Sequence, residues 1–214
     1  MVLARYMLKA GWVLGAFAII ATALIAFTFQ NTAEEIAAQE RAYLLRSIQA
    51  LIPPASFDND VYKDTVSVTD PELLGSRDPV PVYRARKNDE PVALAMEPVA
   101  PDGYSGDIKL LVAIAYDGTL LGVRVVNHQE TPGLGDAIEI TKSRWVTEFD
   151  GRSLSNLDDS QWHVKKDGGI FDQFTGATIT PRAVVKAVHK CLQYYARHRA
   201  RLFATTTNEG SSHG

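Results

Sequence analysis

The feature that most constrains this chain is an uninterrupted apolar run over residues 11–29, GWVLGAFAIIATALIAFTF, which contains no charged side chain. As a helix rising about 1.5 Å per residue, it would be about 28 Å long, close to the hydrocarbon thickness of a bilayer. The alternative is a cleaved secretory signal, because basic residues precede the run and Ala21-Thr22-Ala23 resembles a cleavage site. Since the apolar part of a signal is only about 7 to 15 residues long, the length favours a retained transmembrane helix.

The charges that flank this run bear on its orientation. Arg5 and Lys9 precede it, and Arg41 and Arg46 follow it, so the count of basic residues is tied. Arg5 and Lys9 lie in a short tail, however, whereas long C-terminal domains are translocated largely regardless of their charge. We therefore predict a cytoplasmic N-terminus over residues 1–10 and a main domain outside the cytoplasm.

Composition limits the chemistry of the remaining residues. The chain has 214 residues and a formal net charge of −3, which argues against a nucleic-acid partner. The single cysteine, Cys191, excludes an internal disulfide, a cysteine-ligated zinc site and a cysteine-held iron–sulfur cluster within the chain. His128 and His163 stand at no metal-ligand spacing, so we expect no metal site. Redox chemistry would therefore need an organic cofactor.

Hydrophobic periodicity predicts an α+β domain in which antiparallel strand hairpins pack with helices. A helix following the membrane run is expected to stop at Pro53 and Pro54. The final helix is expected to be capped by Thr180, with Pro181 in its first turn. The expected strands are 66–68, 80–86, 91–99, 107–116, 120–127 and 162–164, and the expected helices are 32–51, 137–145 and the last one, which ends near residue 203. The corresponding regions are a juxtamembrane helix and linker at 30–55, a domain at 56–203 and a flexible tail at 204–214.

The loop before the final helix combines glycine with hydroxyl side chains, reading FTGATITP over residues 174–181. Small residues let a ligand approach the backbone, and the N-terminus of a helix favours an anion such as a phosphate. The structural alternative is that Thr180 is a cap and Gly176 a turn residue.

A second glycine-rich loop, HQETPGLGD at 128–136, follows the second hairpin. Its glycines would let backbone donors face a planar ring. By itself the loop is equally consistent with a hairpin-to-helix connection that has Asp136 as the helix cap.

Taken together, the motifs resemble those of a known family. Residues 172–178, DQFTGAT, resemble the D-x-x-[ST]-G-A-T motif of domains in which FMN is joined through its phosphate to the second threonine. The single N-terminal span, the turn GYSG at 103–106 and ETPGLG at 130–135 are similar to the RnfG family, which supplies one subunit of the Rnf ion-translocating electron-transport complexes.

The resemblance implies that Thr178 is the covalent acceptor of FMN, attached by a separate FMN transferase. It places Thr175, Gly176 and Ala177 around the linkage. The residues that it implies for the flavin pocket are Glu130, Thr131, Gly133, Leu134 and Gly135, with Tyr104 as a nearby aromatic. One departure is Ile179, since a hydroxyl residue often follows the acceptor.

The same resemblance implies an electron-transfer subunit with no catalytic residue of its own. Its setting would be the bacterial inner membrane, crossed once, with the main domain on the periplasmic side and other Rnf subunits as partners. The complex would link ferredoxin and NAD(H) to the movement of Na⁺ or H⁺. Two alternatives stay open: the matching subunit of a sodium-pumping NADH:quinone oxidoreductase, which shares the motif, and a membrane-tethered assembly module without a cofactor.

Overall fold

The computed structural model describes residues 2–204, except for the side chains of residues 2–5, 8, 10, 34, 37 and 40. The chain divides into two compact units, Met1–Arg46 and Ser47–Gly214. The predicted flexible tail at 204–214 lies outside the described residues, apart from residue 204 itself.

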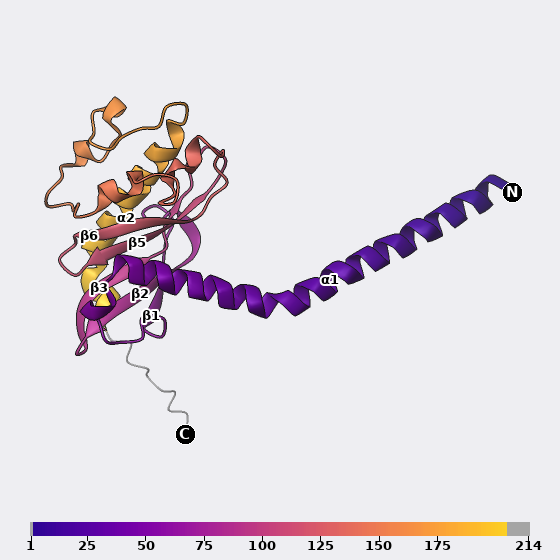
Figure 1. Ribbon diagram of the computed structural model, residues 1–214, viewed down its shortest axis with the longest axis horizontal. Helices are drawn as coiled ribbons and strands as arrows, with labels where there is room; N and C mark the ends of the chain where they lie inside the picture. The colour runs from indigo at the N-terminus through magenta and orange to yellow at the C-terminus, as the bar shows by residue number, and fades with distance from the viewer. Residues whose placement is uncertain (1, 205–214) are drawn as a thin grey trace, which may run out of the picture. The chain divides into compact units, whose positions relative to one another are not determined.

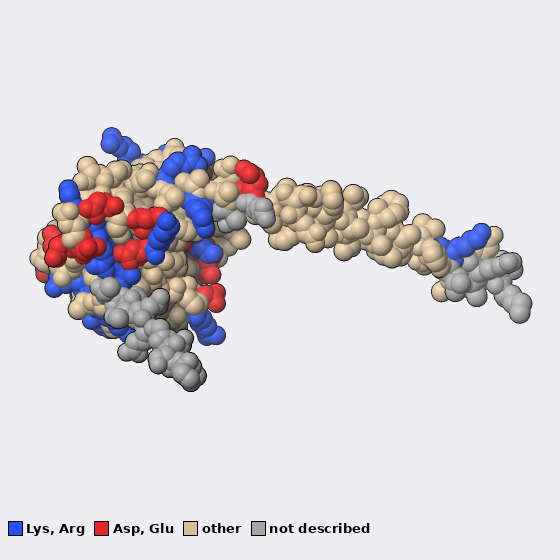
Figure 2. All heavy atoms as spheres, turned by 90° about the horizontal axis from the view of Figure 1, so that it is seen from below, with Lys and Arg blue, Asp and Glu red and all other residues tan. Residues whose placement is uncertain are grey.

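The first unit is helical. Helix α1 (Val2–Leu51) contains a stretch, Gly11–Ala33, that is long and apolar enough to cross a membrane. Figure 2 shows this stretch as a continuous segment without charged residues, with basic residues at one end and acidic residues at the other. Large apolar side chains such as Trp12, Phe17 and Phe27 are exposed along it, as expected of a lipid-facing helix. The predicted juxtamembrane helix at 32–51 is the continuation of α1, which ends before Pro53 as expected.

The second unit contains one antiparallel sheet (Figure 1). Its strands run in the order β1-β2-β3-β5-β4, and β6 pairs with the other edge of β5. Both predicted hairpins are confirmed, as is the predicted strand at 66–68. The β2–β3 turn places Asn88 and Asp89 at φ 50° and 66°, the left-handed values of a tight hairpin turn. The strands are β1 (Thr65–Asp70), β2 (Ser76–Lys87), β3 (Glu90–Met96), β4 (Val99–Ala100), β5 (Ile108–Ala115) and β6 (Leu120–Asn127).

Helix α2 (Ile179–Phe203) packs against β4 and β5. Its predicted apolar face is confirmed, because Val184, Val188, Leu192 and Tyr195 are all buried. Successive strand residues point to opposite faces, and Ala93, Ala95 and Ala113, which alternate with residues of the core shared with α2, are fully buried on the other face. A side-chain β-carbon added to Gly122 on β6 would lie 2.7 Å from the Leu51 side chain. The sheet is therefore covered on both faces, and α2 is held along its length by the core.

The long connection from β6 to α2 gathers at one end of the domain (Figure 1) and is built from short 3₁₀ turns. The predicted helix at 137–145 is wrong: Ser143 Oγ donates a hydrogen bond to the Ala137 carbonyl, and such side-chain bonds compete with helix formation. The predicted strand at 162–164 is also wrong, since only Val164 forms a bridge, with Phe171. The turns are η2 (Gly135–Ile138), η3 (Trp145–Phe149), η4 (Asp159–Gln161) and η5 (Lys165–Asp167); a further turn, η1 (Pro54–Ser56), follows α1.

Aromatic rings tie this connection to the core. Trp145 packs edge-on against Phe149 at 5.5 Å between ring centroids, and Phe149 stacks on Phe171 at 4.7 Å. Phe174 adds an edge-on contact with Trp145 at 5.2 Å. The segment that leads into α2 therefore starts from a packed aromatic base.

Candidate functional site

The start of α2 is the centre of the candidate site. Thr178 occupies the position that flanks the helix, with φ −79° and ψ −25°, and no side chain forms a capping hydrogen bond there. The first N–H groups of a helix have no carbonyl partner within it, so this end presents donors and a positive dipole to an anion. The prediction that Thr180 caps the helix is wrong, because Thr180 lies inside the first turn and is buried.

The loop that precedes the helix is shaped by Gly176. Its φ of +85° lies in the left-handed region, which a glycine adopts at little cost. The Ala177 N–H donates to the Phe174 carbonyl at 3.3 Å, which closes the turn over the aromatic base. Thr175 is exposed and Thr178 is half-buried, so both threonines lie at or near the surface.

Asp172, the first residue of the motif, is held by three groups. Its carbonyl accepts from Trp145 Nε1 at 2.8 Å, and its N–H donates to Glu148 Oε2 at 3.1 Å. Its carboxylate forms an ion pair with Lys165, and this partner raises the pKa of the Lys165 ammonium. Burial raises the pKa of the Glu148 carboxyl. The motif is thus fixed at its beginning by η3 and η5.

The second glycine-rich loop forms a closed turn beside the first. The N–H groups of Leu134 and Gly135 both donate to the Thr131 carbonyl, at 3.1 and 3.0 Å. Gly133 has φ +77°, and its N–H donates to Asp136 Oδ1 at 2.8 Å. Asp136 therefore stabilises the turn and does not cap a helix.

The two loops touch through Leu134. A β-carbon placed on Gly176 would lie 3.3 Å from Leu134 Cδ2, so the two residues are in van der Waals contact range. Leu134 nevertheless remains 44% exposed, and Ile179 at the start of α2 remains 46% exposed. An apolar surface therefore borders the polar helix start.

Glu130 lies beneath these loops and connects three segments. Its side chain is buried, and Oε1 accepts from the Ser105 N–H at 2.9 Å. Its other oxygen, Oε2, accepts a hydrogen bond from the Thr180 hydroxyl. The carboxylate thus joins the turn at 103–106, the loop at 128–136 and the first turn of α2.

His128 fixes the backbone of Glu130. The Glu130 N–H donates to His128 Nδ1 at 3.0 Å, which leaves the ring proton on Nε2. That nitrogen lies 2.8 Å from Glu139 Oε1, and this hydrogen bond lowers the pKa of the Glu139 carboxyl. His128 is a structural residue of the loop.

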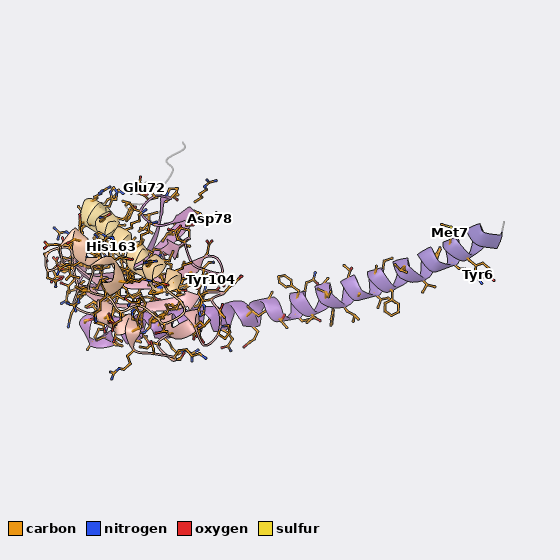
Figure 3. The ribbon with its side chains drawn as sticks, turned by 90° about the horizontal axis from the view of Figure 1, so that it is seen from above. Tyr6, Met7, Glu72, Asp78, Tyr104 and His163 are labelled. Atoms are coloured by element: carbon orange, nitrogen blue, oxygen red, sulfur yellow. The ribbon has the colours of Figure 1, made fainter. Side chains whose placement is uncertain are left out.

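The structure brings every predicted site residue to this region. Residues 175–178 and 131–135 form the two touching loops, and Tyr104 adjoins Ser105 on the third segment. Tyr104 itself is 68% exposed at the domain surface (Figure 3). Sequence reasoning missed the partnership of Ser105 and Thr180 with Glu130, because no spacing rule reports a contact between residues that are so far apart in the chain. Within residues 2–204, no group of three or more His, Cys, Asp or Glu residues is placed to hold a metal ion.

Comparisons with known proteins agree with these motifs. A family model described as an FMN-binding domain matches residues 103–193, which include all three segments, and a model of the RnfG N-terminal region matches residues 1–51. The chain is 48% identical over 207 residues to the G subunit of the ion-translocating oxidoreductase complex of Shewanella baltica, covering 97% of this chain and 98% of the relative. It is 50% identical over 200 residues to the G subunit of the same complex of Pseudomonas aeruginosa, covering 94% of each. The resemblance drawn from the sequence is confirmed: the chain belongs to the RnfG family, the G subunits of ion-translocating oxidoreductase complexes, and contains the FMN-binding domain.

Proposed function

We propose that this chain carries electrons through an FMN that is joined by its phosphate to Thr178 Oγ1, within a membrane-bound, ion-translocating complex. The observation that carries the proposal is the uncapped start of α2, where Thr178 is half-buried and the helix N–H groups have no side-chain acceptor. A phosphate held on Thr178 would meet those donors and the positive end of the helix dipole. The residues present therefore fit the phosphate of the cofactor.

The remaining residues of the two loops fit the other parts of the flavin. Gly176 and Ala177 keep the phosphate region free of bulk, and Thr175 adds a hydroxyl beside it. Leu134 and Tyr104 offer exposed apolar surface for a planar ring. The full set that we assign to the flavin site is Thr178, Thr175, Gly176, Ala177, Thr131, Gly133, Leu134, Gly135 and Tyr104, with the buried Glu130 beneath them.

Electron carriage requires no catalytic side chain. Bound FMN supplies the ability to accept and release electrons one or two at a time, and the protein's part is to hold and orient it. The aromatic base and the Glu130 hydrogen bonds keep the loops in place. The apolar surface beside the helix start would shield one side of the ring from water.

The membrane helix would hold the electron-carrying domain at the bilayer. An anchor in the same bilayer keeps the carrier within reach of the other subunits, which are its expected partners. We propose that the complex links ferredoxin and NAD(H) to Na⁺ or H⁺ movement, and that an FMN transferase attaches the flavin. Ile179, which directly follows the acceptor, is exposed.

We further propose that the chain crosses the bacterial inner membrane once, with residues 56–203 on the periplasmic side. Arg5 and Lys9 in the short N-terminal tail support this orientation. Protease added to intact spheroplasts is expected to digest the domain. Protection of the domain, while a periplasmic control protein is degraded, would contradict the orientation.

Mass spectrometry tests the attachment itself. Full-length chain co-expressed with an FMN transferase and extracted from membranes is expected to show its encoded mass plus that of FMN less one water. Peptide mapping is expected to place the added mass on the peptide that contains Thr178. An encoded mass without addition, with a transferase that labels a positive-control protein, would refute covalent attachment.

A further inference from the structure

We propose that Glu130 and Thr180 act together as positioning residues for flavin attachment, by fixing the first turn of α2 and with it the Thr178 hydroxyl. This inference rests on the proposed attachment of FMN at Thr178. It gives Glu130 a role beneath the site, in addition to its place in the flavin loop. Neither residue is expected to form a bond to the flavin phosphate.

The Glu130 carboxylate is buried where three segments of the chain meet. Glu130 is only 4% exposed, so its two oxygens depend on protein donors. One donor is the Ser105 N–H, 25 residues before Glu130 in the sequence, and the other is the Thr180 hydroxyl, 50 residues after it. A buried carboxylate with two such donors fixes both segments relative to the loop that contains it.

The backbone lies close to this carboxylate on two sides. A β-carbon on Gly135 would lie 2.9 Å from Glu130 Oε2 and 3.0 Å from Thr180 Oγ1. On the other side, a β-carbon on Gly103 would lie 3.0 Å from Glu130 Oε1. Two glycines thus let two loops close directly on the hydrogen-bonded pair, which leaves it little room to move.

The Glu130 carboxylate leaves the N–H groups at the start of α2 without a side-chain acceptor. An acidic side chain near the start of a helix commonly accepts hydrogen bonds from the helix N–H groups. Here the carboxylate is engaged by the Thr180 hydroxyl, and no side chain caps the start of α2. Glu130 therefore anchors the helix without occupying the donors that a phosphate on Thr178 would use.

The connection to Thr178 is short and stiff. Thr180 belongs to the first turn of α2, and Thr178 lies two residues before it with helical dihedral angles. A shift of the first turn would therefore move the Thr178 hydroxyl as well. The transfer needs an activated FMN such as a flavin dinucleotide: the Thr178 Oγ1–P bond forms, the pyrophosphate P–O bond breaks, a nucleoside monophosphate leaves, and the hydroxyl proton passes to a base of the transferase. This attack is sensitive to the placement of the hydroxyl, because a displacement of about 1 Å can cost about a hundredfold in rate.

The test measures the rate of FMN attachment to the full-length chain in detergent, with an FMN transferase, a flavin dinucleotide as the FMN donor and varied chain concentration. Thr180→Val keeps the shape of the side chain and removes its donor, and Thr180→Ser keeps the donor. We expect Thr180→Val to lower kcat at least about tenfold with little change in KM, and Thr180→Ser to stay within about twofold of the parent. A parental kcat in Thr180→Ser, together with a low kcat in Thr180→Val, would show that the hydrogen bond and not the packing of the side chain determines the rate.

Equal kcat values for Thr180→Val and the parent would overturn the inference, as would a Thr180→Ser variant as slow as the valine variant. The urea midpoint of each variant, measured without flavin, shows whether it folds. If Thr180→Val does not fold, Glu130→Gln decides: it keeps the size and weakens both hydrogen bonds, so a parental kcat would overturn the inference. A parent that takes up no flavin, or a Thr178→Val variant that still does, would instead refute the proposed function on which the inference rests.

Discussion

Alanine at position 135 is expected to destabilise the domain strongly, although it adds a single methyl group. The new β-carbon would lie 2.9 Å from Glu130 Cβ and 3.0 Å from Thr180 Oγ1, whereas carbon contacts are most favourable at about 3.5 to 4.0 Å. Overpacking of this kind costs about 1 to 3 kcal/mol. Moving Glu130 away would also weaken a charge-assisted hydrogen bond, which contributes about 1.5 to 3 kcal/mol. We therefore expect Gly135→Ala to lower the free energy of unfolding by about 3 kcal/mol.

Urea unfolding of the flavin-free, full-length chain in detergent measures this loss. Trp145 and Trp162 are buried in the domain, so their fluorescence reports its unfolding. A loss of about 3 kcal/mol corresponds to a midpoint lower by about 1.5 M, if the urea dependence is about 2 kcal/mol per molar. Thr131→Ala is the matched control, because Thr131 is exposed in the same loop and should change stability by less than about 0.5 kcal/mol. Equal midpoints for Gly135→Ala and the parent would refute the close packing around Glu130.

Three other perturbations have defined outcomes. Gly176→Val is expected to reduce flavin content in cells that contain the transferase, because a branched side chain is strained at φ +85°; parental flavin content would contradict this. Cys191 is buried, which raises the pKa of its thiol to about 12, so a thiol reagent at about pH 8 should label it only in denaturant. Burial lowers the pKa of His189, against the opposing effect of Asp159. As the pH falls through about 6.5, the His189 imidazole is therefore protonated in the unfolded state before it is protonated in the folded state. The free energy of unfolding should decline in that range. Thermal melts at about pH 7.5 and about pH 5.5, on either side of that value, should show a smaller decline in His189→Gln than in the parent.

Much of the fold could be predicted because the relevant signals are local. The apolar run beginning at Gly11 has the length of a bilayer, and Asn88-Asp89 and Asp117-Gly118 mark tight turns between β-rich segments. The final helix has a clear apolar face with the periodicity of an α-helix. These signals depend on residues that are close together in the sequence, so they can be recognised without knowledge of the tertiary packing.

The connection from β6 to α2 was harder to predict because side chains decide its structure. Ser143 bonds to the backbone where a helix was expected, and Trp162 enters an aromatic core where a strand was expected. The same limit applies to the site. Its residue types could be read from two motifs, but the partnership of Glu130 with Thr180 depends on a contact between distant segments.

Removal of the Thr178 hydroxyl tests the central claim most directly. Valine matches threonine in shape but offers no oxygen for a phosphoester, and Thr175→Val is the control in the same loop. Each full-length variant is co-expressed with an FMN transferase and run on a denaturing gel, which removes flavin held only by contacts. We predict that the parent and Thr175→Val bands fluoresce under ultraviolet light and that the Thr178→Val band is dark. A fluorescent Thr178→Val band would contradict the assignment of Thr178 as the flavin acceptor.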